Sequence, residues 1–196
     1  MFYFTPFPVR DYQLKGKTAP QQVTDITRRF TLQSFLQKGS ITFDEYFVQD
    51  GEKPDDVAYD YYGDPTLDWL IFFANETKDP YFEWPRSEEQ LRAYIIQKYG
   101  SLSTAYQTVH HYEWIVQQES QYKTNFETII IPEKTVTVDY AKYITLVATE
   151  RKSISMVDYE ENLNEYRRKI FLYDTNLVEQ IKEQHPIVFE EGLFVR

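Results

Sequence analysis

Residues 47–80 read FVQDGEKPDDVAYDYYGDPTLDWLIFFANETKDP and contain two consecutive helix signals. The first helix is predicted to begin at Pro54, because proline fits the first helical turn, and to end at Gly63, because glycine accepts a left-handed conformation. The second is predicted to begin with Asp64 as its capping residue and Pro65 at its first position. Its apolar face comprises Leu67, Leu70, Ile71 and Ala74. The stretch therefore predicts two short helices joined by a tight turn.

The residues before this stretch predict a strand. In ITFDEYFV, residues 41–48, the apolar side chains Ile41, Phe43 and Phe47 alternate with polar ones, which is typical of a half-buried strand. The turn residues Gln49, Asp50 and Gly51 end it.

The residues after the stretch predict an extended link and then a helix. The Asp79-Pro80 and Trp84-Pro85 pairs favour extended backbone. Ser87 and Gln90 form a capping box for a helix that Gly100 closes.

The remaining sequence mixes strand and helix signals. Strands are predicted over 104–116, 128–132 and 135–146, with a polar loop over 117–124, but the sequence leaves their pairing open. DYEENLNEYRR then predicts a helix, KIFLYD a strand, and DTNLVEQIKEQ a helix capped by Asp174. The predicted fold class is α+β.

The first residues predict an aromatic arm. Phe2, Tyr3, Phe4 and Phe7 surround two prolines, which favour an extended path. Burying these rings and ordering the backbone involve free energies of similar size, so the arm is expected to be fixed only in a groove, either of this protein or of a neighbour. A polar spacer over 11–22 and a short helix from Thr24 to Gly39, with Thr24 or Asp25 as its cap, are predicted to follow.

Composition excludes several classes of function. The 31 acidic and 21 basic side chains give a net charge of -10, which opposes binding to nucleic acid. There is no cysteine, so thiolate catalysis and disulfides are excluded. No apolar run is long enough for a membrane helix, and the start does not have the pattern of a secretory signal.

Aromatic residues are in excess at 17%, with 17 Tyr, 14 Phe and 3 Trp. Tyrosine combines a large contact area with few rotatable bonds, which enriches it in protein interfaces. From composition alone, an interface and a tyrosine-rich core explain this excess about equally well.

The sequence shows no motif for catalysis. It contains no glycine-rich phosphate-binding loop, no Gly-x-Ser-x-Gly nucleophile motif and no His-Glu-x-x-His zinc-binding motif. No enzyme activity, cofactor or metal is therefore predicted. His110 and His111 are expected on opposite faces of a strand, with His111 partly buried and hydrogen-bonded. His185 is expected at a helix end, where the helix dipole favours a cation. Carboxylate doublets such as Asp55 and Asp56 are expected on the solvated surface.

The same stretch 47–80 resembles a LysM module. The pattern positions are occupied by Val48, Gly51, Val57, Ala58, Tyr62, Gly63, Pro65, Trp69, Ile71 and Asn75. Such modules commonly bind N-acetylglucosamine polymers, which gives the alternative hypothesis of a peptidoglycan-binding or cell-wall lytic protein. At residues 79–85, DPYFEWP replaces the usual glycine turn and second strand, and Tyr62, Trp69 and Ile71 are expected in the core rather than as sugar platforms.

The chain as a whole is similar to the gene product 53 family of baseplate wedge proteins of contractile-tailed bacteriophages. The resemblance rests, in order, on the aromatic start, TDITRRF at 24–30, the Tyr-Gly-x-Pro-x-Leu-x-Trp core, IQKY at 96–99 and NEYRRKIFLYD near the end. It implies a non-catalytic virion protein of the tail baseplate, assembled in the host cytoplasm. It also implies six copies that clamp neighbouring wedges together and contact other wedge subunits and the sheath-initiating subunit.

The expected domains are an arm with a short helix (1–38), a LysM-like strand-helix-helix unit (39–85) and a mixed α/β region (86–196). Nucleic acid and membrane are not expected partners. The interface hypothesis names Phe2, Tyr3, Phe4, Phe7, Asp79, Pro80, Tyr81 and Trp84.

Overall fold

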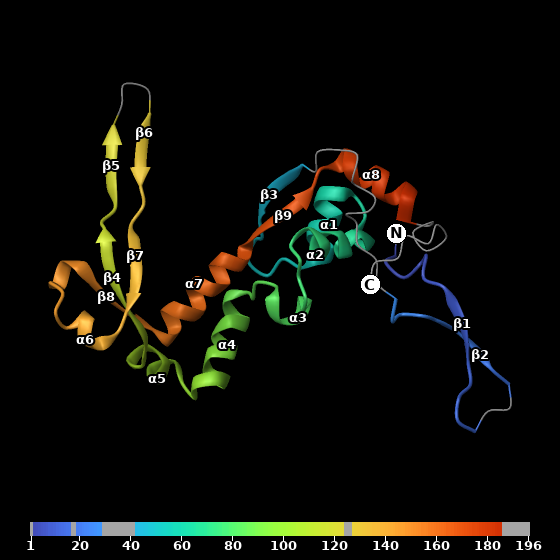
Figure 1. The fold of residues 1–196 in the computed structure, drawn as a ribbon, viewed down its shortest axis with the longest axis horizontal. Coiled ribbons are helices and arrows are strands. Elements are labelled where there is room, and N and C mark those ends of the chain that lie inside the picture. The colour runs from blue at the N-terminus through green and yellow to red at the C-terminus, as the bar shows by residue number, and fades with distance from the viewer. Residues whose placement is uncertain (1, 17–18, 29–41, 124–126, 186–196) are drawn as a thin grey trace. The chain divides into compact units, whose positions relative to one another are not determined.

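The computed structural model describes residues 2–16, 19–28, 42–123 and 127–185 (Figure 1). The chain forms two compact units: unit 1 contains the residues up to 85 and those from 167 onward, and unit 2 contains residues 86–166. Both combine helices with small antiparallel sheets, which confirms the α+β fold class. The predicted domains share the boundary after residue 85 with these units, but residues after 166 return to unit 1. The three-domain division itself stays a prediction.

The elements of unit 1 are β1 (Val9–Tyr12), β2 (Gln21–Thr24), β3 (Phe43–Phe47), α1 (Pro54–Tyr62), the 3-10 helix η2 (Pro65–Leu67), α2 (Asp68–Ala74), α3 (Pro80–Glu83), β9 (Lys169–Tyr173) and α8 (Thr175–Gln184). The elements of unit 2 are α4 (Glu88–Tyr99), α5 (Leu102–Gln107), β4 (Val109–Gln117), β5 (Ser120–Lys123), β6 (Thr128–Ile131), β7 (Lys134–Val138), α6 (Tyr140–Tyr143), η3 (Ala148–Glu150), β8 (Arg151–Ser155) and most of α7 (Met156–Arg168).

Both helix signals in residues 47–80 are confirmed. Helix α1 begins at Pro54 and ends at Gly63, which has φ 73° and donates its N–H to Tyr59 O at 2.8 Å. The Asp64 side chain accepts from Thr66 N at 2.9 Å and so caps the next element. That element divides into η2 and α2.

Replacing Gly63 by valine is expected to lower the free energy of unfolding by about 1–2 kcal/mol, because a β-branched residue is strained at positive φ. Nothing lies within 4 Å of the position that a Cβ atom would occupy, so the cost comes from the backbone alone. Thermal unfolding measures it, and an unchanged melting temperature would show that the cap does not constrain the junction.

The strand predicted over 41–48 is confirmed as β3, but the prediction that Phe43 and Phe47 lie on its buried face is wrong. Strand β3 pairs antiparallel with β9, Glu45 opposite Phe171 and Tyr46 opposite Ile170. This register turns Tyr46 and Val48 toward the core and leaves Phe43 and Phe47 exposed. The strand-helix-helix unit is thus completed by a strand that follows it by almost a hundred residues.

An apolar core stabilises unit 1. Its buried members include Val57 and Leu70 from the helices, Leu172 from β9 and Ile181 from α8. The predicted strand over 169–174 and the final helix are confirmed, with Asp174 accepting from Asn176 N at 2.8 Å as the cap.

The segment 11–22 is not a spacer. Strands β1 and β2 form an antiparallel hairpin in which Val9 is opposite Thr24. The carboxylate of Asp25 lies 2.8 Å from Arg10 Nε and accepts from Thr27 N at 3.2 Å, and hydrogen bonding to Thr27 lowers its pKa. Of the two predicted caps, Thr24 ends a strand and Asp25 accepts the hydrogen bond from Thr27 N. Residues 29–39 of the predicted helix lie outside the described residues.

Unit 2 differs from its prediction in three segments. Ser101 accepts from Thr104 N at 3.0 Å and starts α5, so the predicted strand over 104–116 begins only at Val109. The predicted polar loop contains β5, which pairs with β6, the confirmed strand over 128–131. Helix α6, capped by Asp139, replaces the second half of the strand predicted over 135–146.

The sheet of unit 2 has the order β7-β4-β8. Figure 1 shows β4 and β7 continuing into β5 and β6 as one long hairpin. Its far part exposes apolar side chains: Tyr122 is 65% and Ile130 59% accessible.

Polar side chains cap helix α4 and connect it to helix α7. The predicted capping box of α4 is confirmed, with Ser87 accepting from Gln90 N at 3.3 Å. Asn164 of α7 accepts from Arg86 N at 2.8 Å and donates to Arg86 O at 2.9 Å. Glu160, also on α7, is buried and lies 2.6 Å from Lys98 Nζ of α4.

Candidate subunit interface

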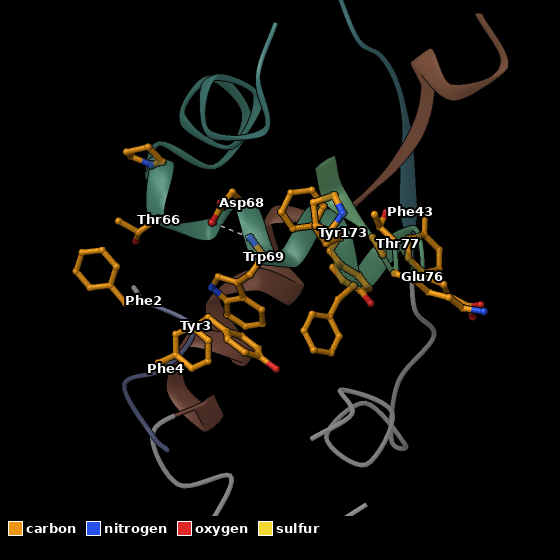
Figure 2. Close-up of a pocket in the computed structure, with 16 residues that line it drawn as sticks. Phe2, Tyr3, Phe4, Phe43, Thr66, Asp68, Trp69, Glu76, Thr77 and Tyr173 are labelled. Atoms are coloured by element: carbon orange, nitrogen blue, oxygen red, sulfur yellow. Dashed lines mark hydrogen bonds between the residues drawn. The ribbon is translucent and has the colours of Figure 1, made fainter. Parts of the chain in front are cut away.

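A hollow of about 1260 Å³ opens on unit 1, and half of the residues that line it are aromatic (Figure 2). Its wall comes from the first residues, from η2 and α2, from the segment after α2, and from β3 and β9. The lining residues are Phe2, Tyr3, Phe4, Phe43, Pro65, Thr66, Asp68, Trp69, Phe72, Phe73, Ala74, Glu76, Thr77, Lys78, Pro80 and Tyr173.

The amino-terminal wall is formed by a segment that turns instead of running extended. Thr5 N donates to Phe2 O at 3.1 Å and Phe7 N donates to Phe4 O at 3.2 Å. Two consecutive turns therefore replace the expected extended path. They bring the rings of Tyr3, Phe4 and Phe7 within 4.9–5.1 Å of one another.

Part of this segment is fixed on the chain's own core. The Tyr3 ring lies 5.7 Å from the Trp69 ring and 5.9 Å from the Phe73 ring, and Figure 2 shows it beside Trp69. Phe7 is 5% exposed, whereas Phe2 is 72% and Phe4 50% exposed. The arm was expected to be fixed in a groove of this protein or of a neighbour. For Tyr3 and Phe7 the structure shows a groove of this protein's own core.

His185 contacts both the amino-terminal segment and Trp69. It is 1% exposed, stacks on Trp69 with ring centroids 4.9 Å apart, and Nε2 donates to Tyr3 O at 3.2 Å. Burial lowers the pKa of His185 to about 4, and the hydrogen bond to Tyr3 opposes this shift. His185 is therefore neutral at pH 7, and the expectation of a cation at this helix end is wrong.

The residues before and within α3 form one rim of the hollow. The Asp79 carboxylate accepts from Tyr81 N at 3.1 Å and caps α3, so the extended link predicted here is wrong. Tyr81 is 83% exposed, its ring 5.0 Å from that of exposed Phe82. Trp84 is half-buried and donates from Nε1 to Glu52 O at 2.9 Å.

The structure thus divides the residues of the interface hypothesis. Phe2, Tyr3, Phe4 and Pro80 line the hollow. Phe7 lies in the core, Asp79 caps a helix, Trp84 is held by Glu52 and Tyr81 is exposed beside the rim. Sequence reasoning missed Phe72 and Phe73, which follow Trp69 on the same helix at the spacing that places residues on one face.

Three charged residues are part of this wall. Asp68 is half-buried, and burial raises the pKa of its carboxyl although the carboxylate accepts from Trp69 N at 2.9 Å. Glu76 and Lys78 add one charge of each sign. The hollow is suited to apolar or aromatic groups with limited charge.

A histidine pair in unit 2 departs from its predicted arrangement. The Nδ1 atoms of His110 and His111 are 2.8 Å apart, because a β-bulge between Val109 and His111 interrupts the alternation of β4. His111 is half-buried with Nε2 3.2 Å from Glu113 Oε1, which confirms its hydrogen-bonding role. Among the described residues there is no cluster of three or more His, Asp or Glu side chains placed to hold a metal ion.

Comparison with known proteins connects the chain to a family. A family model described as "Base plate wedge protein 53" matches residues 2–124, more than half of the chain. The chain belongs to this family. "Baseplate wedge protein gp53" of Enterobacteria phage T4 is 31% identical over 111 residues, which cover 55% of this chain and 56% of the T4 protein. The chain therefore matches about half the length of this relative.

Membership of the base plate wedge protein 53 family makes the chain a structural protein of a phage tail baseplate and places it in the virion. It favours the baseplate hypothesis over the peptidoglycan alternative. The matched range contains the Phe2–Phe4 wall and α2, while Tyr173 lies outside it. Across the described residues, none of the helices has the length and apolar content needed to cross a bilayer.

Proposed function

We propose that this protein joins neighbouring wedges of the baseplate around the tail tube through protein–protein contacts and performs no catalysis. Its expected partners are other wedge subunits, the sheath-initiating subunit and neighbouring wedge copies, with six copies in each baseplate. Family membership supports the setting. The aromatic hollow supports the mode of contact.

The observation that carries the proposal is the exposure of aromatic rings around a preformed hollow. Phe2 is 72% and Phe4 50% exposed although the turns that hold them are docked through Tyr3 and Phe7. Covering the exposed parts of these two rings would contribute roughly 6 kcal/mol as an upper bound, at about 25 cal/mol per Å² of apolar surface. Because the segment is already ordered, little conformational entropy opposes docking.

The partner surface is expected to present apolar or aromatic side chains to the hollow. Interface energy concentrates in a few buried aromatic anchors surrounded by contacts that exclude water. Phe2, Phe4 and the exposed pair Tyr81 and Phe82 fit the role of such anchors, since each keeps a large part of its ring accessible.

The double variant Phe2→Ala, Phe4→Ala is expected to fold normally and to reduce incorporation into baseplates at least tenfold, since it removes exposed rings and leaves the core rings in place. Incorporation is measured by complementing a phage that lacks the gene and counting copies of the protein in purified tails.

Tyr59→Ala is the matched control, because Tyr59 is 61% exposed on α1 and does not line the hollow. The control should incorporate like the wild type. Equal incorporation of the double variant and the control would show that the hollow is not a docking site.

A further inference from the structure

We propose that the outer edge of β3 is a strand-addition site for an extended segment of another baseplate protein, in which a basic residue stands between apolar residues at alternating positions. The open edge is independent of the proposed function, but the choice of a baseplate protein as partner rests on it.

The hydrogen-bond pattern shows which groups of β3 face outward. Asp174 N donates to Thr42 O at 3.2 Å and Val48 N donates to Arg168 O at 2.9 Å. In an antiparallel pair such bonded positions alternate with non-bonded ones, so the even-numbered residues of β3 bond to β9. The peptide groups of Phe43, Glu45 and Phe47 therefore point away from β9.

These outward groups form an open edge. Within the described chain β3 has β9 as its sole neighbour, and the N–H groups of Phe43, Glu45 and Phe47 have no hydrogen-bond partner. The carbonyl of Phe47 accepts from Gln49 Nε2 at 2.9 Å, which closes one end. Strand β3 has neither a proline nor a bulge, two of the devices that prevent pairing at a sheet edge, and its charged residues are Asp44 and Glu45.

The other edge of the same sheet is closed by side chains. Asn75 donates from Nδ2 to Phe171 O and accepts at Oδ1 from Phe171 N, both at 2.8 Å. Tyr173 N donates to the Tyr62 hydroxyl at 3.0 Å. One amide side chain thus replaces a neighbouring strand along β9. Strand β3 lies beside β9 in Figure 1, and none of the described residues provides such a replacement along its outer edge.

The exposed face at this edge indicates the chemistry of the partner. Phe43 is 42% and Phe47 53% exposed on the same face as Glu45. The Glu45 side chain is 62% exposed although one carboxylate oxygen lies 2.9 Å from Lys169 Nζ. Apolar residues opposite the two rings and a cation opposite the carboxylate give favourable cross-strand pairs.

A second copy of this chain is a poor occupant. Antiparallel pairing of two β3 strands over their full length places Glu45 directly opposite Glu45 of the second copy, and like charges in that position are destabilising. A heterologous strand avoids this repulsion. The site shares Phe43 with the aromatic hollow and otherwise uses different residues.

The decisive variant is Glu45→Pro. Proline removes the outward N–H of residue 45 and keeps the backbone hydrogen bonds to β9, because the peptide groups of residue 45 point away from β9. It also removes the ion pair between Glu45 and Lys169 of β9, and so does the control Glu45→Ala. We expect incorporation into baseplates to fall at least tenfold with a melting temperature close to that of the wild type. Glu45→Ala, which keeps the N–H, should lose less than about threefold.

Hydrogen exchange on the full chain provides a second readout that does not depend on the variant's folding. Exchange of the segment 43–47 is expected to slow at least tenfold when the wild-type protein passes from the free state into purified baseplates. Exchange that is equally fast in both states would overturn the proposal, as would normal incorporation of Glu45→Pro.

The outcomes separate the two proposals. Loss with Glu45→Pro and no loss with the double variant Phe2→Ala, Phe4→Ala would support the edge and reject the hollow, and the opposite pattern would reject the edge. Dimerisation of the purified chain that Glu45→Pro abolishes, measured by analytical ultracentrifugation, would show that a second copy occupies the edge and would overturn the choice of partner.

Discussion

Replacing Leu172 by alanine is expected to lower the free energy of unfolding by about 2–5 kcal/mol. Leu172 of β9 is fully buried, in the same core as α1 and α2. The truncation removes apolar contacts and leaves a cavity in a unit whose strands are far apart in sequence. Urea unfolding of the full chain, followed by tryptophan fluorescence, measures the change.

Phe171→Ala is the control, since Phe171 is the next residue on β9 and is 41% exposed on the opposite face. Its truncation should cost under about 1 kcal/mol. Similar losses for both variants would mean that β9 does not fold into the core as the register requires.

The second large effect concerns pH. Burial lowers the pKa of His185 from 6.5 to about 4, so between these values the unfolded chain binds more protons than the folded one. The stabilisation is complete above the unfolded pKa and is lost as the pH falls toward 4. Between pH 7 and pH 4.5 the contribution of His185 should fall by about 2.5 kcal/mol.

His185→Gln isolates this effect, because glutamine keeps a donor for Tyr3 O and does not titrate over this range. The free energy of unfolding is measured for both proteins across the pH range. The variant should lose less stability on acidification than the wild type, by about the amount given above. Parallel pH profiles would show that His185 is not held neutral against Trp69.

Local signals predicted the helices well. Pro54, Gly63, Asp64 and Ser87 act through their own backbone geometry or through hydrogen bonds within three residues, so their effects can be read from short stretches. The errors at 101–107 and 79–83 also came from local caps: the hydroxyl of Ser101 and the carboxylate of Asp79 outweighed strand propensity and proline punctuation.

Pairing over long sequence separations could not be predicted. The partner of β3 is β9, and the facing of Phe43 and Phe47 follows from that register, which no local pattern specifies. The same holds for Asn75, whose role along β9 becomes visible only when Phe171 is placed beside it.

The candidate interface was predicted in part. Aromatic excess near the first residues drew attention to Phe2, Tyr3 and Phe4, which do line the hollow. The contact of Tyr3 and His185 with Trp69 determines which rings stay exposed. These three residues are far apart in the sequence, so composition could not predict the contact.

Photo-crosslinking in assembled virions tests the central claim most directly. A benzoylphenylalanine at position 4 places the photoreactive group at the exposed ring of the hollow, and one at position 59 provides an exposed site away from it. Irradiation should join position 4 to another baseplate subunit and leave position 59 largely unjoined. Crosslinks absent from position 4, or equally frequent at both positions, would contradict the account.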